Sequence, residues 1–184
     1  MDMENKFDIV FNRLQEIKLD ENVLCKAFWL KVLRLHQNFN EAECWQLMTE
    51  NISWLLKAKK HFGIDVEILT SKEIIEWFPE DILNEHHIYA QGKHHVSNAQ
   101  VIGIGNVQLE IDGHSEVHLF DNAFANCVDT TFVKGYDKSK FIVTDCIGNA
   151  FENCKSDAKG LSIIENWTNN TVIKGPNSLV VNRK

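Results

Sequence analysis

The densest group of chemically reactive side chains in this sequence lies in EHHIYAQGKHH, where His86, His87, His94 and His95 stand close together. Imidazole nitrogens are common zinc ligands, and a neutral ring can also act as a general base. The spacing matches no metal-binding motif, and adjacent strand residues point to opposite faces, so at most one histidine of each pair can enter a shared ligand shell. We therefore expect hydrogen-bonded junction histidines, with a metal-dependent enzyme as an alternative.

Aspartate recurs every eight residues in the stretch FDNAFANCVDTTFVKGYD, at Asp121, Asp129 and Asp137, and again at Asp145. A column of carboxylates could bind calcium, but calcium-binding solenoid repeats have GGxGxD corners. Here a single aspartate is followed by Asn, Thr, Lys or Cys. Because aspartate tolerates left-handed conformations and bonds to nearby backbone, we expect these residues to form turns without calcium.

The five cysteines are odd in number and form no CxxC pair, which predicts reduced thiols in a cytoplasmic protein. Cys25 and Cys44 lie in apolar helical contexts and are expected to be small core residues. A catalytic thiol needs a base beside it, and nothing in the sequence places one. The G-x-S-x-G, phosphate-loop and H-E-x-x-H motifs are also missing, so we predict no enzyme, no metal and no cofactor.

The aspartates belong to a repeat of eight residues that starts at Asn98 and runs NAQVIGIG, NVQLEIDG, HSEVHLFD, NAFANCVD, TTFVKGYD, KSKFIVTD. The second position is small or β-branched, the fourth is apolar, the sixth is small or aliphatic, and the eighth is Gly or Asp. Positions two, four and six share one face of a strand because strand side chains alternate. One such strand cannot bury its inner face, but stacked copies can, which predicts a β-solenoid. An antiparallel sandwich is the alternative fold.

The repeat is displaced once. NAFENCKS at 149–156 repeats NAFANCVD at 122–129 with an offset of 27 residues, which is three octads plus three residues. Three more blocks follow, LSIIENWT, NNTVIKGP and NSLVVNRK. We expect two octads, or 16 residues, in each coil rather than 24, and a bulged corner or loop in the displaced segment 146–160.

Residues 1–85 have the period of helices. Phe7, Val10, Phe11, Leu14 and Ile17 are spaced as on one helix face. The expected caps of three further helices are Asp20, Asn40 and Ser71, with Val23 inside the second helix and a strand at 64–69. Most of Trp29, Trp45, Trp54 and Trp77 are expected in the core. The predicted fold is therefore α+β, with a small helical domain at 1–85 and a β-solenoid of eight-residue repeats at 86–184.

The net charge of −7 is unevenly distributed, because residues 1–85 carry 10 Lys or Arg and 16 Asp or Glu, against 9 and 10 in residues 86–184. This acidity disfavours phosphate backbones, and an RNA-binding alternative would need a basic stripe that the sequence does not reveal. It suits a basic surface on a partner protein. No apolar run is long enough to span a membrane, and no secretory signal is evident. The candidate partner-binding residues are Glu41, Glu43, Glu50, Glu73 and Glu76.

The octads, above all HSEVHLFDNAFANC with its D-N-A corner, resemble the x-V-x-A-x-D-N-A repeat arrays in proteins of Bacteroidota and their phages. IYAQGKHHVSNAQV resembles the segment that leads into such arrays. The resemblance covers about 88–157 and implies a β-solenoid but no particular activity, and Cys127, Cys146 and the segment 146–160 depart from the pattern.

A small acidic protein with its own helical head on a solenoid is also similar to phage-encoded anti-CRISPR inhibitors. The resulting hypothesis is a non-enzymatic protein-binding module that inhibits a defence nuclease or its RNA-bound complex. A glycan-binding surface solenoid is a further alternative. Exposed solenoid ends would also allow a homodimer.

Overall fold

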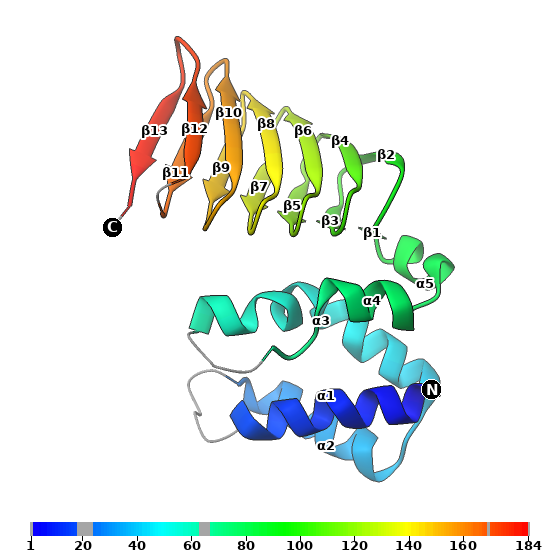
Figure 1. Ribbon diagram of the computed structural model, residues 1–184. Coiled ribbons are helices and arrows are strands. Elements are labelled where there is room, and N and C mark those ends of the chain that lie inside the picture. The colour runs from blue at the N-terminus through cyan, green and yellow to red at the C-terminus, as the bar shows by residue number, and fades with distance from the viewer. Residues whose placement is uncertain (1, 18–23, 63–66, 169, 184) are drawn as a thin grey trace. The chain divides into compact units, whose positions relative to one another are not determined.

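The computed structural model describes residues 2–17, 24–62, 67–168 and 170–183, without the side chains of 58–62. The chain divides into two compact units, Met1–Ile82 and Leu83–Lys184. The first is helical and the second consists of parallel strands (Figure 1). The predicted α+β class with a C-terminal β-solenoid is confirmed. No helix in the described ranges is both long and apolar enough to cross a membrane.

The helical unit follows the predicted periodicity over most of its length. Its elements are α1 (Met3–Ile17), α2 (Lys26–Gln37), α3 (Glu41–Phe62), α4 (Ser71–Trp77) and the start of α5 (Glu80–Glu85). All five apolar residues expected on one face of α1 are buried. Asn40 accepts a hydrogen bond from the backbone N–H of Glu43 at 2.9 Å, so it caps α3 as predicted. Trp29 is buried, while Trp45, Trp54 and Trp77 are half-buried.

Three local predictions in this unit need comment. Thr70, not Ser71, caps α4, because its hydroxyl accepts from the Glu73 N–H while the Glu73 carboxylate accepts from the Thr70 N–H. Residues 67–69 form no strand, and 64–66 lie outside the described residues. Asp20 and Val23, predicted at the start of the second helix, also lie outside them. The described helix α2 begins only at Lys26.

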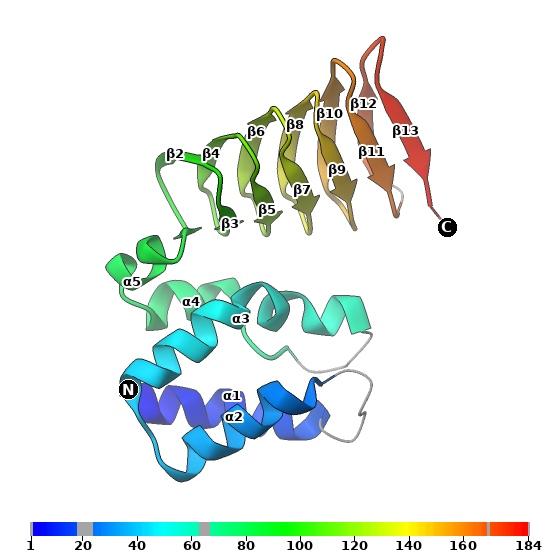
Figure 2. The same ribbon diagram turned by 180° about the vertical axis from the view of Figure 1, so that it is seen from behind.

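The second unit is a solenoid of two facing sheets, which Figures 1 and 2 show from opposite sides. Odd-numbered strands form a seven-stranded sheet in the order β1-β3-β5-β7-β9-β11-β13, and even-numbered strands form a six-stranded sheet from β2 to β12. Neighbouring strands are parallel, and β3 pairs with β5 so that Gln100 lies beside Glu116. That register confirms the predicted 16 residues per coil. The strands are β1 (Ile88–Tyr89), β2 (Lys93–Ser97), β3 (Gln100–Gly103), β4 (Gln108–Asp112), β5 (Glu116–Leu119), β6 (Phe124–Val128), β7 (Phe132–Gly135), β8 (Lys140–Thr144), β9 (Ile147–Ala150), β10 (Lys155–Lys159), β11 (Ile163–Asn166), β12 (Thr171–Lys174) and β13 (Leu179–Asn182).

The second, fourth and sixth octad positions fill the space between the two sheets, as the alternation predicts. Their side chains form one continuous buried cluster from Val96 to Ile164. Phe141 is the largest member, and a Cβ atom placed on Gly135 or Gly148 would come within 2.8 Å of its ring. The two glycines therefore leave the space that the phenyl ring occupies, because protein interiors are close-packed.

The eighth octad position makes the corners. Asp121, Asp129, Asp137 and Asp145 all have left-handed backbones, with φ between 55° and 64°. The Asp121 carboxylate accepts a hydrogen bond from the Gly105 N–H at 3.0 Å, and that of Asp145 accepts from the Leu161 N–H at 2.8 Å. The aspartates therefore shape the turns and link successive coils. Each octad ends in one corner, so an aspartate recurs every eight residues.

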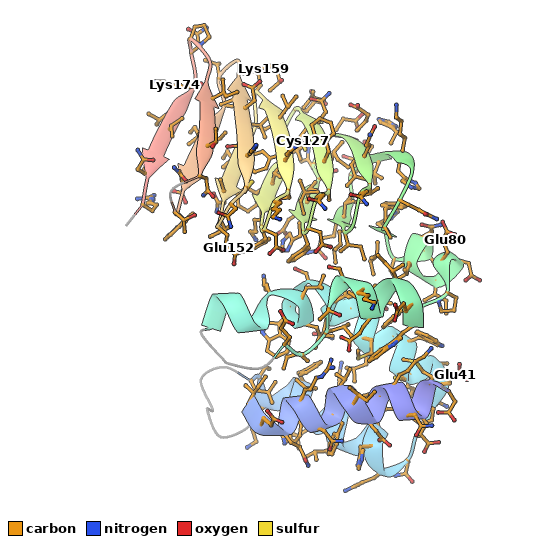
Figure 3. The ribbon with its side chains drawn as sticks, in the orientation of Figure 1. Glu41, Glu80, Cys127, Glu152, Lys159 and Lys174 are labelled. Carbon is orange, nitrogen blue, oxygen red and sulfur yellow. The ribbon has the colours of Figure 1, made fainter. Side chains whose placement is uncertain are left out.

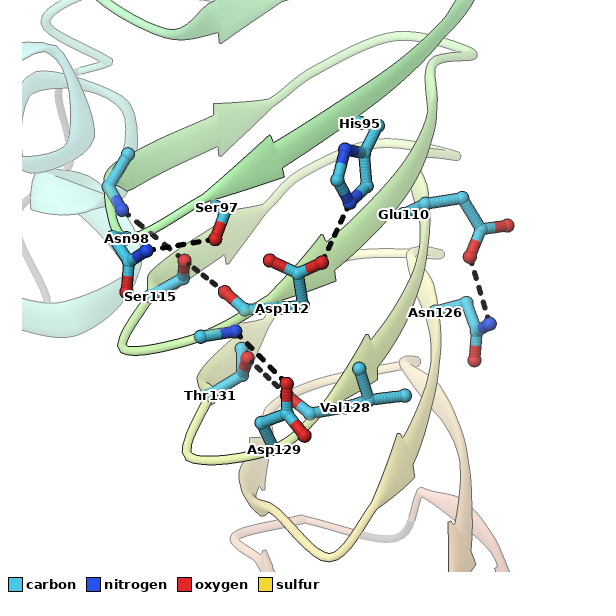
Figure 4. A network of polar contacts seen from close by, with 12 residues as sticks. His95, Ser97, Asn98, Glu110, Asp112, Ser115, Asn126, Val128, Asp129 and Thr131 are labelled. Atoms are coloured by element: carbon cyan, nitrogen blue, oxygen red, sulfur yellow. Dashed lines mark hydrogen bonds and ion pairs between the residues drawn. The ribbon is translucent and has the colours of Figure 1, made fainter.

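Hydroxyl groups at the second octad position close the corners between even and subsequent odd strands (Figure 4). Ser115 donates to the Asp112 carbonyl at 2.8 Å, and Thr131 donates to the Val128 carbonyl at 2.7 Å. Each bond spans three residues and satisfies a carbonyl that the turn removes from the strand ladder. The preference for small hydroxylated residues at this position therefore has a local structural cause.

The displaced segment 146–160 is neither a bulge nor a loop, which corrects the prediction. It contains the regular strands β9 and β10, and Phe132 pairs with Ile147, 15 residues later. The corner between β8 and β9 consists of Asp145 and Cys146, one residue shorter than the corner between β6 and β7. The Cys146 thiol donates to the Thr144 carbonyl at 3.0 Å. A shortened corner thus preserves the stacking while changing the sequence offset.

Candidate functional site

The five glutamates predicted to bind a partner lie on two helices of the helical unit. Glu41, Glu43 and Glu50 belong to α3, whereas Glu73 and Glu76 belong to α4. Glu41 is exposed in the first turn of α3, where its negative charge interacts favourably with the positive end of the helix dipole (Figure 3). Glu76 is exposed and lies 3.7 Å from the Lys72 ammonium group.

Glu43 and Glu50 line one depression of about 260 Å³ between α2 and α3. Its wall also contains two cations, Lys31 and Arg34, and Arg34 pairs with Glu43 at 2.7 Å. Glu50 accepts a hydrogen bond from the Gln46 amide at 2.8 Å. The lining thus contains two acidic and two basic side chains, so this depression is not an acidic site for a basic partner.

Glu73 is held within the helical unit. Its two carboxylate oxygens accept hydrogen bonds from Arg13 at 3.0 and 2.8 Å, and Arg13 also donates to the Ile68 carbonyl at 3.1 Å. Burial alone would raise the pKa of Glu73, but the bonds from Arg13 and Thr70 outweigh it and lower the pKa. Glu73 therefore connects α1 to α4 and is not available to a partner in the way the sequence suggested.

Of the four junction histidines, His86, His87 and His95 are exposed, and His94 is partly buried at the start of the solenoid core. His94 takes an inner position in register with Leu109, and its ring stacks on Tyr89 with 4.2 Å between the ring centroids. His87 contacts the Tyr89 hydroxyl at 3.2 Å. His95 points away from His94 and pairs with Asp112 at 2.8 Å (Figure 4). In the described part of the chain, no three His, Cys, Asp or Glu side chains gather as metal ligands.

The cysteines have two kinds of environment. Cys44, Cys127, Cys146 and Cys154 are buried, and burial raises the pKa of Cys44 and Cys154 to about 12. A high thiol pKa leaves little thiolate, which is the nucleophilic form. Cys25 is exposed, which corrects its prediction as a core residue, because it precedes the first residue of α2 instead of lying within the helix. Backbone hydrogen bonds from Phe28 and Ala27 lower its pKa.

An exposed file of aliphatic side chains crosses the outer face of the seven-stranded sheet. Ile147, Ile163 and Leu179 lie in register on β9, β11 and β13, and we call them the aliphatic row. Their exposed fractions are 48%, 38% and 51%, respectively. Side chains at the third octad position point outward, so the same alternation that predicts the core also predicts this file. The inner columns of the repeat do not reveal this file, because its members occupy outward positions.

Aromatic rings form a second file on this sheet. Phe120 stacks on Tyr136 with centroids 5.0 Å apart, Tyr136 on Phe151 at 4.9 Å, and Phe151 on Trp167 at 6.0 Å. Trp167 is exposed, and the Arg183 guanidinium lies 6.0 Å from its ring centroid. Stacked rings of this kind stabilise neighbouring coils, and the exposed indole follows the last residue of β11, at the end of that strand opposite to Ile163.

A charged cluster lies on the outer face nearer the start of the same sheet. Glu116 accepts hydrogen bonds from Lys134 at 2.7 Å and from His118 at 3.0 Å. The Lys134 bond, followed by the His118 bond, lowers the pKa of Glu116 to about 2. Because Lys134 lies on β7 and Glu116 on β5, the charged bond between them links these two strands.

This cluster predicts a pH dependence of stability. A depressed carboxyl pKa stabilises the fold above the ordinary value of 4.5, and the stabilisation is lost as the pH falls toward about 2. Because Glu116 is more than a third exposed, solvent screening limits the effect, and we expect about 1 kcal/mol. The free energies of unfolding of wild type and Glu116→Gln, measured by chemical denaturation, should therefore differ by about 1 kcal/mol at neutral pH and become equal in acid.

The matched control is Glu110→Gln on the other sheet, where the carboxylate accepts from the neutral Asn126 amide at 2.9 Å. The difference in free energy of unfolding between Glu110→Gln and wild type should change less with pH. Parallel stability curves for wild type and Glu116→Gln from neutral to acidic pH would contradict the assignment.

Comparison with protein-family models, curated proteins and solved structures finds no match for this chain.

Proposed function

We propose that this protein is a non-enzymatic module that binds another protein. The observation that carries the proposal is the aliphatic row, in which Ile147, Ile163 and Leu179 expose apolar surface at regular intervals on a rigid sheet. Large apolar side chains that gather on an exposed face are typical of protein interaction sites. Trp167, exposed at the other end of β11 from Ile163, is of the residue type most enriched among energetically dominant interface residues.

The proposed partner has a basic surface as well as an apolar one. The motivation is the net charge of −6 in residues 1–85 and the exposed carboxylates of Glu41 and Glu76. Basic surfaces are a general property of proteins that bind nucleic acids, so a defence nuclease, or its RNA-bound complex, is the partner class we propose. The five free cysteines support a cytoplasmic, reducing location for this inhibitor-like role.

The test begins with affinity capture of partners on the intact chain, using lysates of bacteria and of phage-infected bacteria, followed by mass spectrometry. For a captured protein, Ile147→Lys combined with Ile163→Lys should weaken binding by about tenfold or more, because two apolar contacts are replaced by charges that must be desolvated. Isothermal titration calorimetry with purified proteins measures the change.

The matched control is Ile173→Lys, which alters an equally aliphatic and more exposed residue on β12 of the other sheet. Equal losses from both variants, or none from the double variant, would contradict the aliphatic row as the interface. Glu41→Lys with Glu76→Lys should weaken binding mainly at low salt, as expected for exposed charges. Light scattering that showed the wild type to be a dimer, and the double variant a monomer, would instead assign the row to self-association.

A further inference from the structure

A depression of about 520 Å³ lies in the solenoid, along the even-numbered strands. Three exposed lysines line it, Lys138, Lys140 and Lys155, together with the side chains of Asn122, Asn153 and Asn170. We call this depression the lysine groove. Its residues come from the corners and strand starts of β6, β8, β10 and β12, so it crosses several consecutive coils.

The strand register is what gathers the lysines. Lys140 and Lys155 are direct neighbours on β8 and β10, although they are 15 and not 16 residues apart. The shortened corner at Asp145 and Cys146 causes this offset. Because 15 is not a multiple of eight, the octad pattern does not place these two lysines in the same column, and no basic stripe is evident in the sequence.

The charges in the lysine groove are unbalanced. Lys134 on the other sheet has Glu116 as a partner, whereas the described lining of the lysine groove contains three ammonium groups and no carboxylate. The nearby Asp137 carboxylate accepts a hydrogen bond from the Asp121 N–H at 3.3 Å. Like charges directly opposite each other on adjacent strands destabilise a sheet, and a bound anion would relieve the repulsion.

The donor chemistry favours phosphate over carboxylate as the bound group. Lysine acts on phosphate as a mobile point charge, whereas planar carboxylates are best held by the double fork of arginine, and no arginine lines the groove. The amides of Asn122 and Asn153 add neutral donors that can reach phosphate or base oxygens, whereas the Asn170 amide already donates to the Ala150 carbonyl and the Asn166 side chain.

The length of the groove favours a chain of phosphates. Its lining extends from the coil of β6 to that of β12, three strand spacings of about 4.8 Å each, or about 14 Å. Phe124 continues the column beside Lys140 and is only half-buried, so its ring offers a surface on which a base can stack.

We infer that the lysine groove binds a short stretch of single-stranded nucleic acid, with its phosphates on Lys138, Lys140 and Lys155. The inference goes beyond the proposed function and does not depend on it. It uses the six-stranded sheet, whereas the aliphatic row lies on the seven-stranded sheet. It also differs from the expectation, based on the overall negative charge, that the protein does not contact nucleic acid directly.

Fluorescence anisotropy with a labelled single-stranded oligonucleotide of mixed sequence tests the inference on the intact protein at low salt. Wild type should bind, with a slope of log affinity against log salt of roughly −2, since three phosphate contacts contribute about −0.7 each. Lys140→Glu combined with Lys155→Glu should lower the affinity by about tenfold or more. Phe124→Ala should lower it by about fivefold if a base stacks on the ring.

The control on the same strand is Lys159→Glu, at the other end of β10 from Lys155, whereas Glu152 lies in the corner before β10 (Figure 3). Its affinity should stay within about twofold of the wild-type value. Lys140→Gln with Lys155→Gln removes the charges without adding new ones, and circular dichroism checks that each variant is folded. The double Gln variant should also weaken binding if the lysines contact phosphate.

Three outcomes would overturn the inference. The first is no binding by wild type, and the second is equal binding by wild type and both double-lysine variants. The third is preferential binding of a sulfated polysaccharide such as heparin, or of inorganic polyphosphate, with no effect of Phe124→Ala. That third result would assign the groove to a polyanion that has no bases.

Discussion

Phe141→Ala is expected to destabilise the solenoid by about 3–4 kcal/mol, a large part of the stability of an ordinary domain. The ring is almost fully buried at the centre of the inner columns. Its two flanking positions are Gly135 and Gly148, which have no side chains that could move into the space left by the ring. The cavity therefore stays open, and both transfer and cavity contributions are lost.

Urea unfolding followed by the far-ultraviolet circular dichroism of the strands measures this effect. The matched control is Phe124→Ala, which removes the same group from the outer face of the same sheet, where the side chain is half-buried. The control should lose less than half as much stability. Equal losses, or a loss below about 1 kcal/mol for Phe141→Ala, would show that the coils collapse around the vacated space.

The reciprocal substitution tests the same packing from the other side. A Cβ atom at Gly148 would lie 2.8 Å from the Phe141 ring, so Gly148→Ala should also destabilise the solenoid. The double variant Gly148→Ala with Phe141→Leu should lose less free energy of unfolding than the two single variants together, because leucine leaves room for the added methyl group.

Glu73→Ala is expected to destabilise the helical unit by about 2–3 kcal/mol. The substitution removes both bonds from Arg13 and the carboxylate half of the capping box at Thr70. It also leaves a guanidinium that is less than a third exposed without its main anionic partner. Unpaired charged groups that are partly buried cost more than the paired arrangement contributes, which places this effect above that of a surface ion pair.

Tryptophan fluorescence is the appropriate probe, because four of the five tryptophans lie in the helical unit, at Trp29, Trp45, Trp54 and Trp77. The matched control is Glu76→Ala on the same helix, which breaks only an exposed pair with Lys72 and should change stability by about 0.5 kcal/mol or less. A Glu73→Ala variant as stable as the control would contradict the structural role of Glu73 and leave it as a candidate partner-binding residue.

The contrast between these two glutamates affects how charge-reversal experiments are designed. Reversal at Glu73 is expected to reduce any binding by unfolding the helical unit, whereas reversal at Glu41 or Glu76 changes only the exposed charge. Thermal unfolding of each variant therefore has to accompany a binding measurement.

The architecture of the solenoid can be predicted from the sequence, because inward and outward positions alternate along each strand and local turn propensity selects the corner residues. The buried columns from Val101 to Phe141 and the left-handed aspartates follow from two properties of the chain, strand alternation and turn propensity. The buried face of α1 follows in the same way from helical periodicity. These features need no information about distant residues.

Contacts between residues that are distant in the sequence become visible only in the folded chain. Arg13 and Glu73 are 60 residues apart, and no local pattern marks them as partners. A corner one residue shorter brings Lys140 beside Lys155, and the stacking of coils turns isolated outward residues into the aliphatic row. The physical reason is that periodicity specifies the face on which a side chain lies, whereas its neighbours depend on register, and one missing residue changes the sequence offset of the two strand pairs that span it, β7 with β9 and β8 with β10.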